Sequence, residues 1–154
     1  MIRILGYSAG AAAFAIAIYG MVAAIVGVHR REAALVRSAR TAAYANFVLL
    51  TIANLAMVYA LLTHDFSIDY VAQVGSRATP LVFTIISLWS SLEGSILFWG
   101  LILAAYTAAA MWRTGPKLGS MGAYANAIML GVGAFFYMLL VGPANPWGLV
   151  SPVP

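Results

Sequence analysis

The chain has 154 residues and a mean hydropathy of +0.95; 64% of the residues are hydrophobic and 8% are charged. This composition excludes an ordinary water-soluble domain and indicates an integral membrane protein. The net charge of +4 does not indicate nucleic-acid binding, because the Arg and Lys residues cluster between apolar runs and form no basic face. The absence of Cys also excludes disulfides, thiolate metal sites and cysteine nucleophiles.

Two membrane spans are predicted in the first part of the chain, at residues 4–28 and 41–63. The first is roughly 37 Å long, enough to cross a bilayer with some tilt. A cleaved signal peptide is the alternative for this run, but the run is too long and its basic residues follow it. Residues 29–40, which hold four Arg and one Glu, are expected to form a short polar loop between the two spans.

Three asparagines lie inside predicted spans. Asn46 and Asn54 are eight residues apart on the second span, so they lie roughly on one helical face. Asn126 lies on the fourth span, predicted at 121–141. We expect these amides to point inward and to join helices by hydrogen bonds; a substrate path through the bundle is the alternative.

The segment after the second span contains the most acidic part of the chain. Asp65 and Asp69 are four residues apart and are expected to cap a short surface helix or to lie near its N-terminus. His64 is a candidate axial heme ligand, although a solvated histidine at a helix end beside Asp65 is the simpler interpretation. His29 lies at the end of another span on the opposite side, so the two histidines cannot hold one iron together.

The apolar region from Leu81 to Trp112 is too long for one membrane helix. It would measure roughly 48 Å, against a hydrocarbon core of about 30 Å. It should divide between Ser90 and Ser95, where small polar residues interrupt it. We therefore predict an interfacial or re-entrant piece before a third span at 95–112, within an outer loop that covers 64–94.

Glu93 is the informative carboxylate, because it stands at this division beside a long apolar run. A helix N-terminus favours its charge, Gly94 permits close backbone approach, and Ser95 can cap the helix. One interpretation is a helix-start motif at the water interface. The other is that Glu93, together with Trp89 and Trp99, lines an outer pocket or docking groove.

The predicted fold is an all-α integral membrane protein, a single domain with four transmembrane helices and an interfacial segment before the third. A Pro-rich tail at 142–154 follows the fourth span. The loops after spans one and three hold six Arg and Lys residues, whereas the opposite side holds Arg3 and Arg77. The positive-inside rule then places both termini and the Trp89 stretch outside, which is the periplasmic side in a bacterial inner membrane.

Three stretches together resemble one family. They are HDFSIDYVA at 64–72, LWSSLEGSILFW at 88–99 and NPW at 145–147. Their order and spacing resemble the N-terminal part of CcmF-type proteins, the heme lyase subunit of cytochrome c maturation. Those proteins have a DFSVxYVA-like loop, a W-G-x-x-E-G-S-L-L-L-W stretch and an N-P-F end. The residues that carry the resemblance are Asp65, Phe66, Tyr70, Trp89, Glu93, Gly94, Ser95, Trp99, Asn145 and Pro146.

The resemblance implies a membrane component of cytochrome c biogenesis that works on heme at the outer side. The implied cofactor is heme, bound through the complete protein or partner subunits. The implied partners are the remainder of the heme lyase or a split partner subunit, a heme chaperone and apocytochrome c, besides the lipid bilayer. Trp89, Glu93, Gly94, Ser95 and Trp99 are then expected to shape the outer groove, with no catalytic residue and no metal ligand among them.

The chain also departs from the family pattern. The Trp-rich segment and the heme-ligating histidines of the family lie further along and are absent, so the chain is expected to be an N-terminal piece or a split subunit that does not ligate heme alone. Leu92 stands where the family has His or Gln, which places any polar role of that position in doubt. A small transporter subunit, with Glu93 in the path, or a structural assembly subunit is the alternative.

Overall fold

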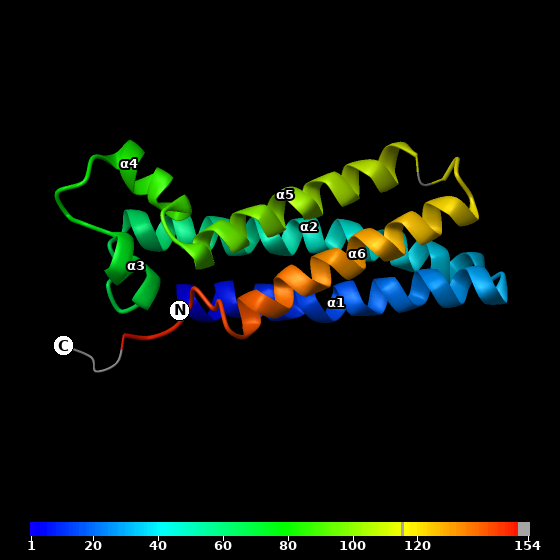
Figure 1. Cartoon of the computed structure of the whole chain (residues 1–154), viewed down its shortest axis with the longest axis horizontal. Coiled ribbons are helices and arrows are strands. Elements are labelled where there is room, and N and C mark those ends of the chain that lie inside the picture. The colour runs from blue at the N-terminus through cyan, green and yellow to red at the C-terminus, as the bar shows by residue number, and fades with distance from the viewer. Residues whose placement is uncertain (115, 151–154) are drawn as a thin grey trace.

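The computed structural model describes residues 1–114 and 116–150 (Figure 1). Six α-helices and one short 3-10 helix occur in these ranges. They are α1 (Ile2–Arg30), α2 (Ala33–Leu62), α3 (Asp69–Val74), α4 (Leu81–Ile86), η1 (Ser87–Trp89), α5 (Leu92–Arg113) and α6 (Ser120–Val141).

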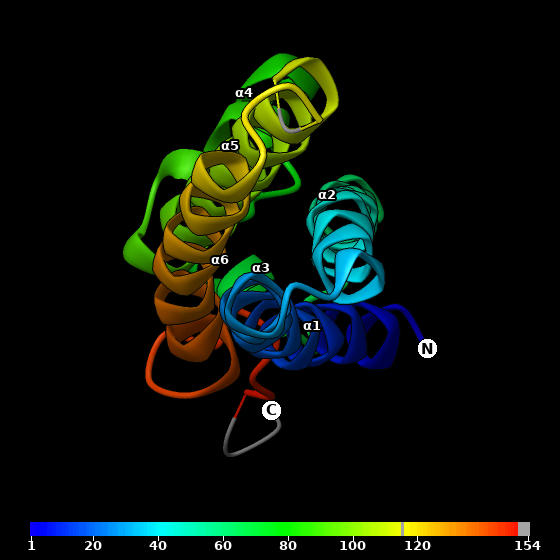
Figure 2. The same ribbon diagram turned by 90° about the vertical axis from the view of Figure 1, so that its right-hand side faces the viewer.

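Four of these helices are long and apolar enough to cross a membrane, namely α1, α2, α5 and α6, with 29, 30, 22 and 22 residues. This finding confirms the prediction of four spanning helices. They form an up-and-down bundle in which α1 packs along α2 and α6, and α5 packs along α2 and α6 (Figures 1 and 2). The connections between consecutive long helices are at alternate ends of the bundle.

Small residues line the helix contacts. All nine buried residues of α1 are Ala or Gly, and they recur every three or four positions along one face. Lipid is as apolar as the side chains, so spanning helices gain stability mainly from close packing, which small residues permit. Larger residues of the same helix, such as Ile4 and Ile18, are exposed toward the region that lipid occupies around a spanning bundle.

The first two helices join at a tight turn, so the expected polar loop at 29–40 is wrong. Arg31 adopts a left-handed conformation with φ 55°, and its backbone and that of Glu32 donate hydrogen bonds to the last carbonyls of α1. The next helix begins at Ala33, and Arg37 and Arg40 lie within it. Hydropathy detects where a helix becomes polar, not where it ends, and α2 continues well beyond its apolar part.

The long apolar region divides as predicted, although the break is shorter. α4 and η1 occupy residues 81–89, Ser90 and Ser91 separate them from the next helix, and α5 begins at Leu92. Ser95 is therefore inside the helix, and the expected cap at this residue is wrong. Ser91 holds the N-cap position with extended backbone angles.

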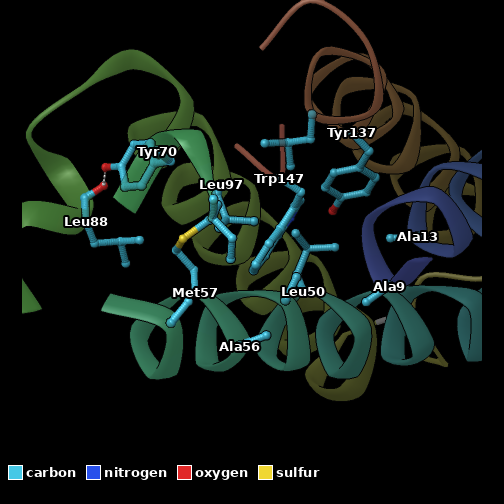
Figure 3. Packing of buried hydrophobic residues seen from close by; sticks show 14 of the residues in the cluster. Ala9, Ala13, Leu50, Ala56, Met57, Tyr70, Leu88, Leu97, Tyr137 and Trp147 are labelled. Carbon is cyan, nitrogen blue, oxygen red and sulfur yellow. Dashed lines mark hydrogen bonds between the residues drawn. The ribbon is translucent and has the colours of Figure 1, made fainter. Parts of the chain in front are cut away.

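The bundle has two different ends (Figure 1). At one end lie the start of α1, residues 63–91 and the segment after α6; we call this the loop end. At the other lie the turn at Arg31 and the α5–α6 connection; we call this the arginine end. Between them, buried side chains such as Leu50, Met57 and Leu97 fill the core near the loop end (Figure 3).

Candidate functional site

The acidic segment begins with a compact reversal after α2. The backbone N–H groups of His64 and Asp65 donate to the carbonyls of Leu61 and Ala60, and His64 adopts a φ of 52°. The Asp65 carboxylate then accepts hydrogen bonds from the Ser67 backbone at 3.3 Å and from its hydroxyl at 2.5 Å. Asp65 therefore fixes the turn before α3 but does not cap this helix, whose N-cap is Ile68, whereas Asp69 lies in its first turn as one form of the expectation has it.

Tyr70 connects this segment to the stretch around Trp89. It is 3% exposed, and its hydroxyl lies 2.9 Å from the Ser87 carbonyl oxygen and 2.8 Å from that of Leu88, to which it donates (Figure 3). Burial raises the pKa of the hydroxyl above its ordinary 10.0, and the nearby Glu93 carboxylate acts in the same direction. Tyr70 thus stays protonated and ties α3 to η1.

Gly94 permits this arrangement, as the sequence predicts. A Cβ atom at this position would lie 2.1 Å from the Leu88 carbonyl oxygen and 2.1 Å from the Tyr70 hydroxyl oxygen. Such distances are far inside van der Waals contact, so a residue with a side chain would displace the backbone of η1 or the tyrosine. The first turn of α5 can approach α3 and η1 only because this residue is glycine.

Glu93 lies in the first turn of α5, half-buried, where the helix N-terminus favours a negative charge. The Ser91 hydroxyl donates to its Oε2 at 2.8 Å. Asp69 lies nearby and accepts a hydrogen bond of 2.8 Å from Gln73. Both carboxylates face one recess of about 20 Å³, which has room for about one water molecule. The recess is lined by Asp69, Tyr70, Gln73, Glu93, Asn145 and Pro146.

The segment after α6 closes this recess. The Asn145 side-chain oxygen accepts a hydrogen bond of 2.9 Å from the Trp147 backbone, and the Asp69 backbone donates to the Gly148 carbonyl at 2.9 Å. An isolated antiparallel bridge joins Ile68 to Leu149. The segment is thus a packed part of the loop end through residue 150, whereas the rest of the predicted tail, 151–154, lies outside the described residues.

Trp147 anchors the segment against the first helix. It is 3% exposed, and a Cβ on Gly6 would lie 2.1 Å from its indole ring, so the ring lies flush on the backbone of α1. Sequence reasoning identified Trp147 only as the end of a motif and did not give it a site role. The usable signal was Gly6 near the start of the first span, because a glycine in a helix often marks a place where another group approaches closely.

Trp89 and Trp99 lie apart from the recess around Glu93. They are 50% and 58% exposed, and neither is among the described residues that line it. They flank Phe98 instead, with ring centroids 4.7 Å and 6.4 Å from it. The expected single groove of Glu93 with both tryptophans is therefore replaced by a polar recess and a separate aromatic surface.

Two neighbouring residues belong to that surface. The Ser95 hydroxyl donates to the Trp89 carbonyl oxygen at 3.3 Å, which holds the end of η1 on α5. Leu92, where the family has a polar residue, is 67% exposed and takes no part in the recess. The aromatic surface can pack against lipid or another protein.

His64 does not provide an open ligand for a heme iron. Its Nε2 atom is buried and has no hydrogen-bond partner among the described residues, and its ring lies 5.9 Å from that of Phe66. The Arg77 guanidinium lies 5.7 Å from the centre of the same phenylalanine ring. Searched over the described residues, the chain has no group of three His, Cys, Asp or Glu that could hold a metal ion.

The described residues of the loop end therefore do not fit a heme by themselves. The recess is about 20 Å³, far smaller than the several hundred Å³ of sites that enclose cofactors. His29 lies at the opposite end of the bundle, at the end of α1, and cannot supply a second ligand beside His64.

The asparagines divide into two groups. Asn54 donates to the carbonyl oxygens of Leu50 at 2.8 Å and of Leu97 on α5 at 3.2 Å, which confirms its expected interhelical role. Asn46 is buried, and neither polar atom of its side chain has a partner among the described residues. The expected bridge between helices is therefore wrong for Asn46. The Oδ1 atom of Asn126 likewise has no partner among the described residues.

The three stretches singled out in the sequence meet at this site. Residues 64–72, 88–99 and 145–147 are far apart in the chain, and hydrogen bonds and backbone pairing bring them together around Tyr70, Glu93 and Asn145. What the arrangement offers chemically is a positioned pair of carboxylates and a shaped surface. No nucleophile, metal centre or open cofactor cavity accompanies them in the residues that line this recess.

Comparison with known proteins identifies relatives over nearly the whole chain. It is 31% identical over 156 residues to the cytochrome c-type biogenesis protein CycK of Rhizobium meliloti, covering 100% of this chain and 23% of that protein. It is 31% identical over 152 residues to CcmF of Pseudomonas aeruginosa, covering 99% and 23%. A search of protein-family models found no match.

A solved structure has the same fold. The cytochrome c heme lyase CcmF matches 99% of this chain with a TM-score of 0.91 and 31% sequence identity, and the chain corresponds to 26% of that structure. The chain thus spans about a quarter of the length of the relatives it matches.

Proposed function

Because the chain is a homologue of the CcmF-type cytochrome c biogenesis proteins and matches their N-terminal portion, we propose that it serves as the corresponding membrane component of cytochrome c biogenesis. It acts in this proposal as part of a heme lyase assembly and does not join heme to apocytochrome c alone. The observation that supports it is the meeting of the three family-like stretches at one end of a bundle that matches the solved heme lyase.

The loop end faces the outer, periplasmic side of the inner membrane in this proposal. The support is the charge distribution: six Arg and Lys residues lie at or near the arginine end, and two lie at the loop end. Cytoplasmic ends of spanning helices are enriched in these residues. Both the N-terminus and residues 142–150 then lie outside.

The loop end acts as a positioning surface. The recess holds two carboxylates in place, and the aromatic surface around Trp89 and Trp99 presents apolar area to the remainder of the lyase, to a split partner subunit or to the heme region of the assembly. Heme, a heme chaperone and apocytochrome c are handled by the assembly as a whole. The carboxylate of Glu93 contributes charge and hydrogen bonding at the junction and breaks no bond.

Replacing Glu93 with Gln tests this role in a strain whose own copy has been deleted. Glutamine keeps the size and accepts the Ser91 hydrogen bond, but it removes the charge at the helix N-terminus. We expect the yield of c-type cytochromes, measured by heme staining, to fall several-fold, with the protein still present in the membrane fraction.

Glu32→Gln is the matched control, because Glu32 is an exposed glutamate at the arginine end and its loss should leave the yield unchanged. Equal yields from both variants would reduce Glu93 to a helix-start residue. If deletion of the chain leaves c-type cytochromes intact, and the purified assembly shows no heme absorbance, the proposed function itself is wrong.

A further inference from the structure

A pocket of about 330 Å³ opens at the arginine end, the end of the bundle opposite to the recess around Glu93. It lies between the α1–α2 turn, the first turns of α2 and the start of α6. Its lining residues are Gly27, Val28, Arg31, Ala33, Val36, Arg37, Arg40, Pro116, Gly119, Ser120 and Ala123.

The charge of this pocket is one-sided. Arg31, Arg37 and Arg40 line it, and none of its described lining residues is Asp or Glu. The chain has four carboxylates, and the one at this end, Glu32, is exposed and does not belong to the lining. Three guanidinium groups around one hollow repel one another, so an anion between them lowers their free energy.

The helix ends at the pocket also favour an anion. Ala33 and Ser120 are the first residues of α2 and α6, and the partial positive charge of both helix N-termini is directed there. The end of α1 is present as well, with the opposite sign, but its Gly27 and Val28 carbonyls already accept hydrogen bonds from the turn. The electrostatic potential in the pocket is therefore positive.

A polar side chain lies deeper on the same path. Arg40 is half-buried and lines both the pocket and a smaller recess that it shares with Asn126. Asn126 is 2% exposed, and its Oδ1 atom has no partner among the described residues. The hollow thus continues inward from the arginines to a buried amide.

An apolar groove adjoins the pocket along the contact of α1 with α6. It has a volume of about 250 Å³ and is lined by Met21, Ile25, Tyr124, Ala127, Ile128 and Gly131. Ile25 is three residues before Val28, and Ala127 is four residues after Ala123, so groove and pocket are neighbours on the same helix faces. A ligand with a phosphate and an alkyl chain matches this pair of hollows.

We propose that the arginine pocket binds the phosphate group of an anionic phospholipid, with an acyl chain of the same lipid in the α1–α6 groove. The shared chemistry is a phosphate oxyanion held by guanidinium groups, whose planar donors match phosphate geometry. A free phosphate ion would satisfy the arginines alone. The groove, which runs toward the centre of spanning helices, assigns the ligand to the bilayer, where basic pockets between helices bind anionic headgroups.

Lipid retention tests the proposal. The chain is reconstituted in nanodiscs of phosphatidylcholine and phosphatidylglycerol in equal amounts, released in the mass spectrometer, and compared with Arg37→Gln/Arg40→Gln. We expect the unchanged chain to retain phosphatidylglycerol in preference to phosphatidylcholine. The double variant should lose retention by about 100-fold, because each removed arginine forfeits charge-assisted hydrogen bonds to the phosphate, and these contribute about tenfold per arginine.

Arg113→Gln is the control, because Arg113 is an exposed arginine at the same end that does not line the pocket; it should retain phosphatidylglycerol fully. If the double variant loses helical circular dichroism, the single variant Arg37→Gln takes its place, with about tenfold loss expected from the lost charge-assisted hydrogen bonds. Arg37→Lys/Arg40→Lys should fall between the unchanged chain and the Gln variant, because it keeps the charge and loses the planar donors.

Three outcomes would overturn the proposal. The first is equal retention of both lipids by the unchanged chain. The second is a double variant that retains phosphatidylglycerol as well as Arg113→Gln does. The third is stabilisation of the lipid-stripped chain by inorganic phosphate, lost in the double variant, without selective lipid retention; the ligand would then be a soluble phosphate and not a lipid.

Discussion

Gly94 is a position at which the loop end has no room for added volume. Gly94→Ala would place a methyl group 2.1 Å from the Leu88 carbonyl oxygen and the Tyr70 hydroxyl. We expect a loss of about 3 kcal/mol of stability, at the upper end of the usual range for overpacking. Thermal unfolding in detergent micelles, followed by circular dichroism, measures this loss.

Gly10→Ala is the matched control for this substitution. A Cβ at Gly10 meets nothing within 4 Å, and alanine is the better helix former by up to about 1 kcal/mol. The melting temperature should therefore stay constant or rise. Equal melting temperatures for the two alanine variants would show that the close approach at Gly94 does not constrain the loop end.

The Tyr70 hydroxyl is expected to matter beyond the packing of its ring. Tyr70→Phe keeps the ring and removes the donor to the Leu88 carbonyl oxygen, whereas the Ser87 carbonyl oxygen still accepts hydrogen bonds from Ser90. A lost hydrogen bond of this kind costs about 1–3 kcal/mol when the remaining group stays buried. Tyr59→Phe, at a residue that is 57% exposed, is the control in the same unfolding measurement and should change little; a similar drop in both variants would contradict the role of this hydroxyl.

Two asparagines on one helix should respond in opposite directions to the same substitution. Asn54→Leu removes the bond from α2 to the Leu97 carbonyl and should destabilise the bundle by about 0.6–1.7 kcal/mol. Asn46→Leu replaces an amide that has no partner among the described residues, so it should be neutral or stabilising. Unfolding of the two variants side by side decides this, and a large loss at Asn46 would reveal a partner for its amide.

At the scale of elements, the loop end is held by a contact between the first helix and the last described segment. Trp147 lies on Gly6, and the same segment pairs with residues 67–69 through Val150 and Gly148. The segment after α6 therefore fixes the position of α3, although the two are far apart in the chain. A substitution in α1 at the Trp147 contact should therefore alter the structure of residues 64–72.

Gly6→Ala tests that path. The added methyl group would meet the indole of Trp147 at 2.1 Å, so the ring and the backbone that follows it must move. We expect the Asp69 amide, which donates to Gly148, to exchange its hydrogen about tenfold faster, as its bond opens more often. Hydrogen exchange of peptides that cover 64–72 reports this; unchanged exchange, matching Gly10→Ala, would mean that the segment stays docked without its anchor.

Much of the element level could be predicted from the sequence, and what was missed has identifiable physical causes. Apolar length located the four spans and the division near Ser90, because the bilayer thickness limits a helix directly. The helical state of Arg37 and Arg40 was missed, because hydropathy does not register a helix that continues into water. The burial of Trp147 was missed as well, since it depends on a long-range contact with α1, for which Gly6 gives only an indirect signal in the sequence.

In the candidate site, features set by local backbone chemistry could be predicted, whereas features set by packing between distant segments could not. The close approach at Gly94 and the place of Glu93 at a helix start follow from local backbone chemistry and could be predicted. The separation of Glu93 from Trp89 and Trp99 could not, because it depends on which face of α5 meets α3. The lack of a hydrogen-bond partner for Asn46 among the described residues could not be predicted either, because periodicity places this residue inside the bundle but does not identify its neighbours.

At the scale of the whole molecule, the chain allows its orientation to be measured directly. It contains no Cys, so a single introduced cysteine reports one position. We expect Ser76→Cys, in the exposed loop before α4, to react with a membrane-impermeant maleimide added to intact spheroplasts. Lys117→Cys, between α5 and α6, should react only after permeabilisation, because the proposed orientation, which rests on the positive-inside rule, has that end inside; the reverse pattern would invert the proposed orientation.

The pairing of Asp69 with Gly148 has a consequence for biosynthesis. Residues 64–91 leave the ribosome before α6 does, so during synthesis the acidic loop exists without the strand-like segment that pairs with it. The loop end can be completed only after the fourth helix has been inserted, so the recess around Glu93 cannot form before residues 142–150 have been made. A ribosome stalled before residue 142 should hold a chain with the early helices in the membrane and the Asp69 region still open to proteases.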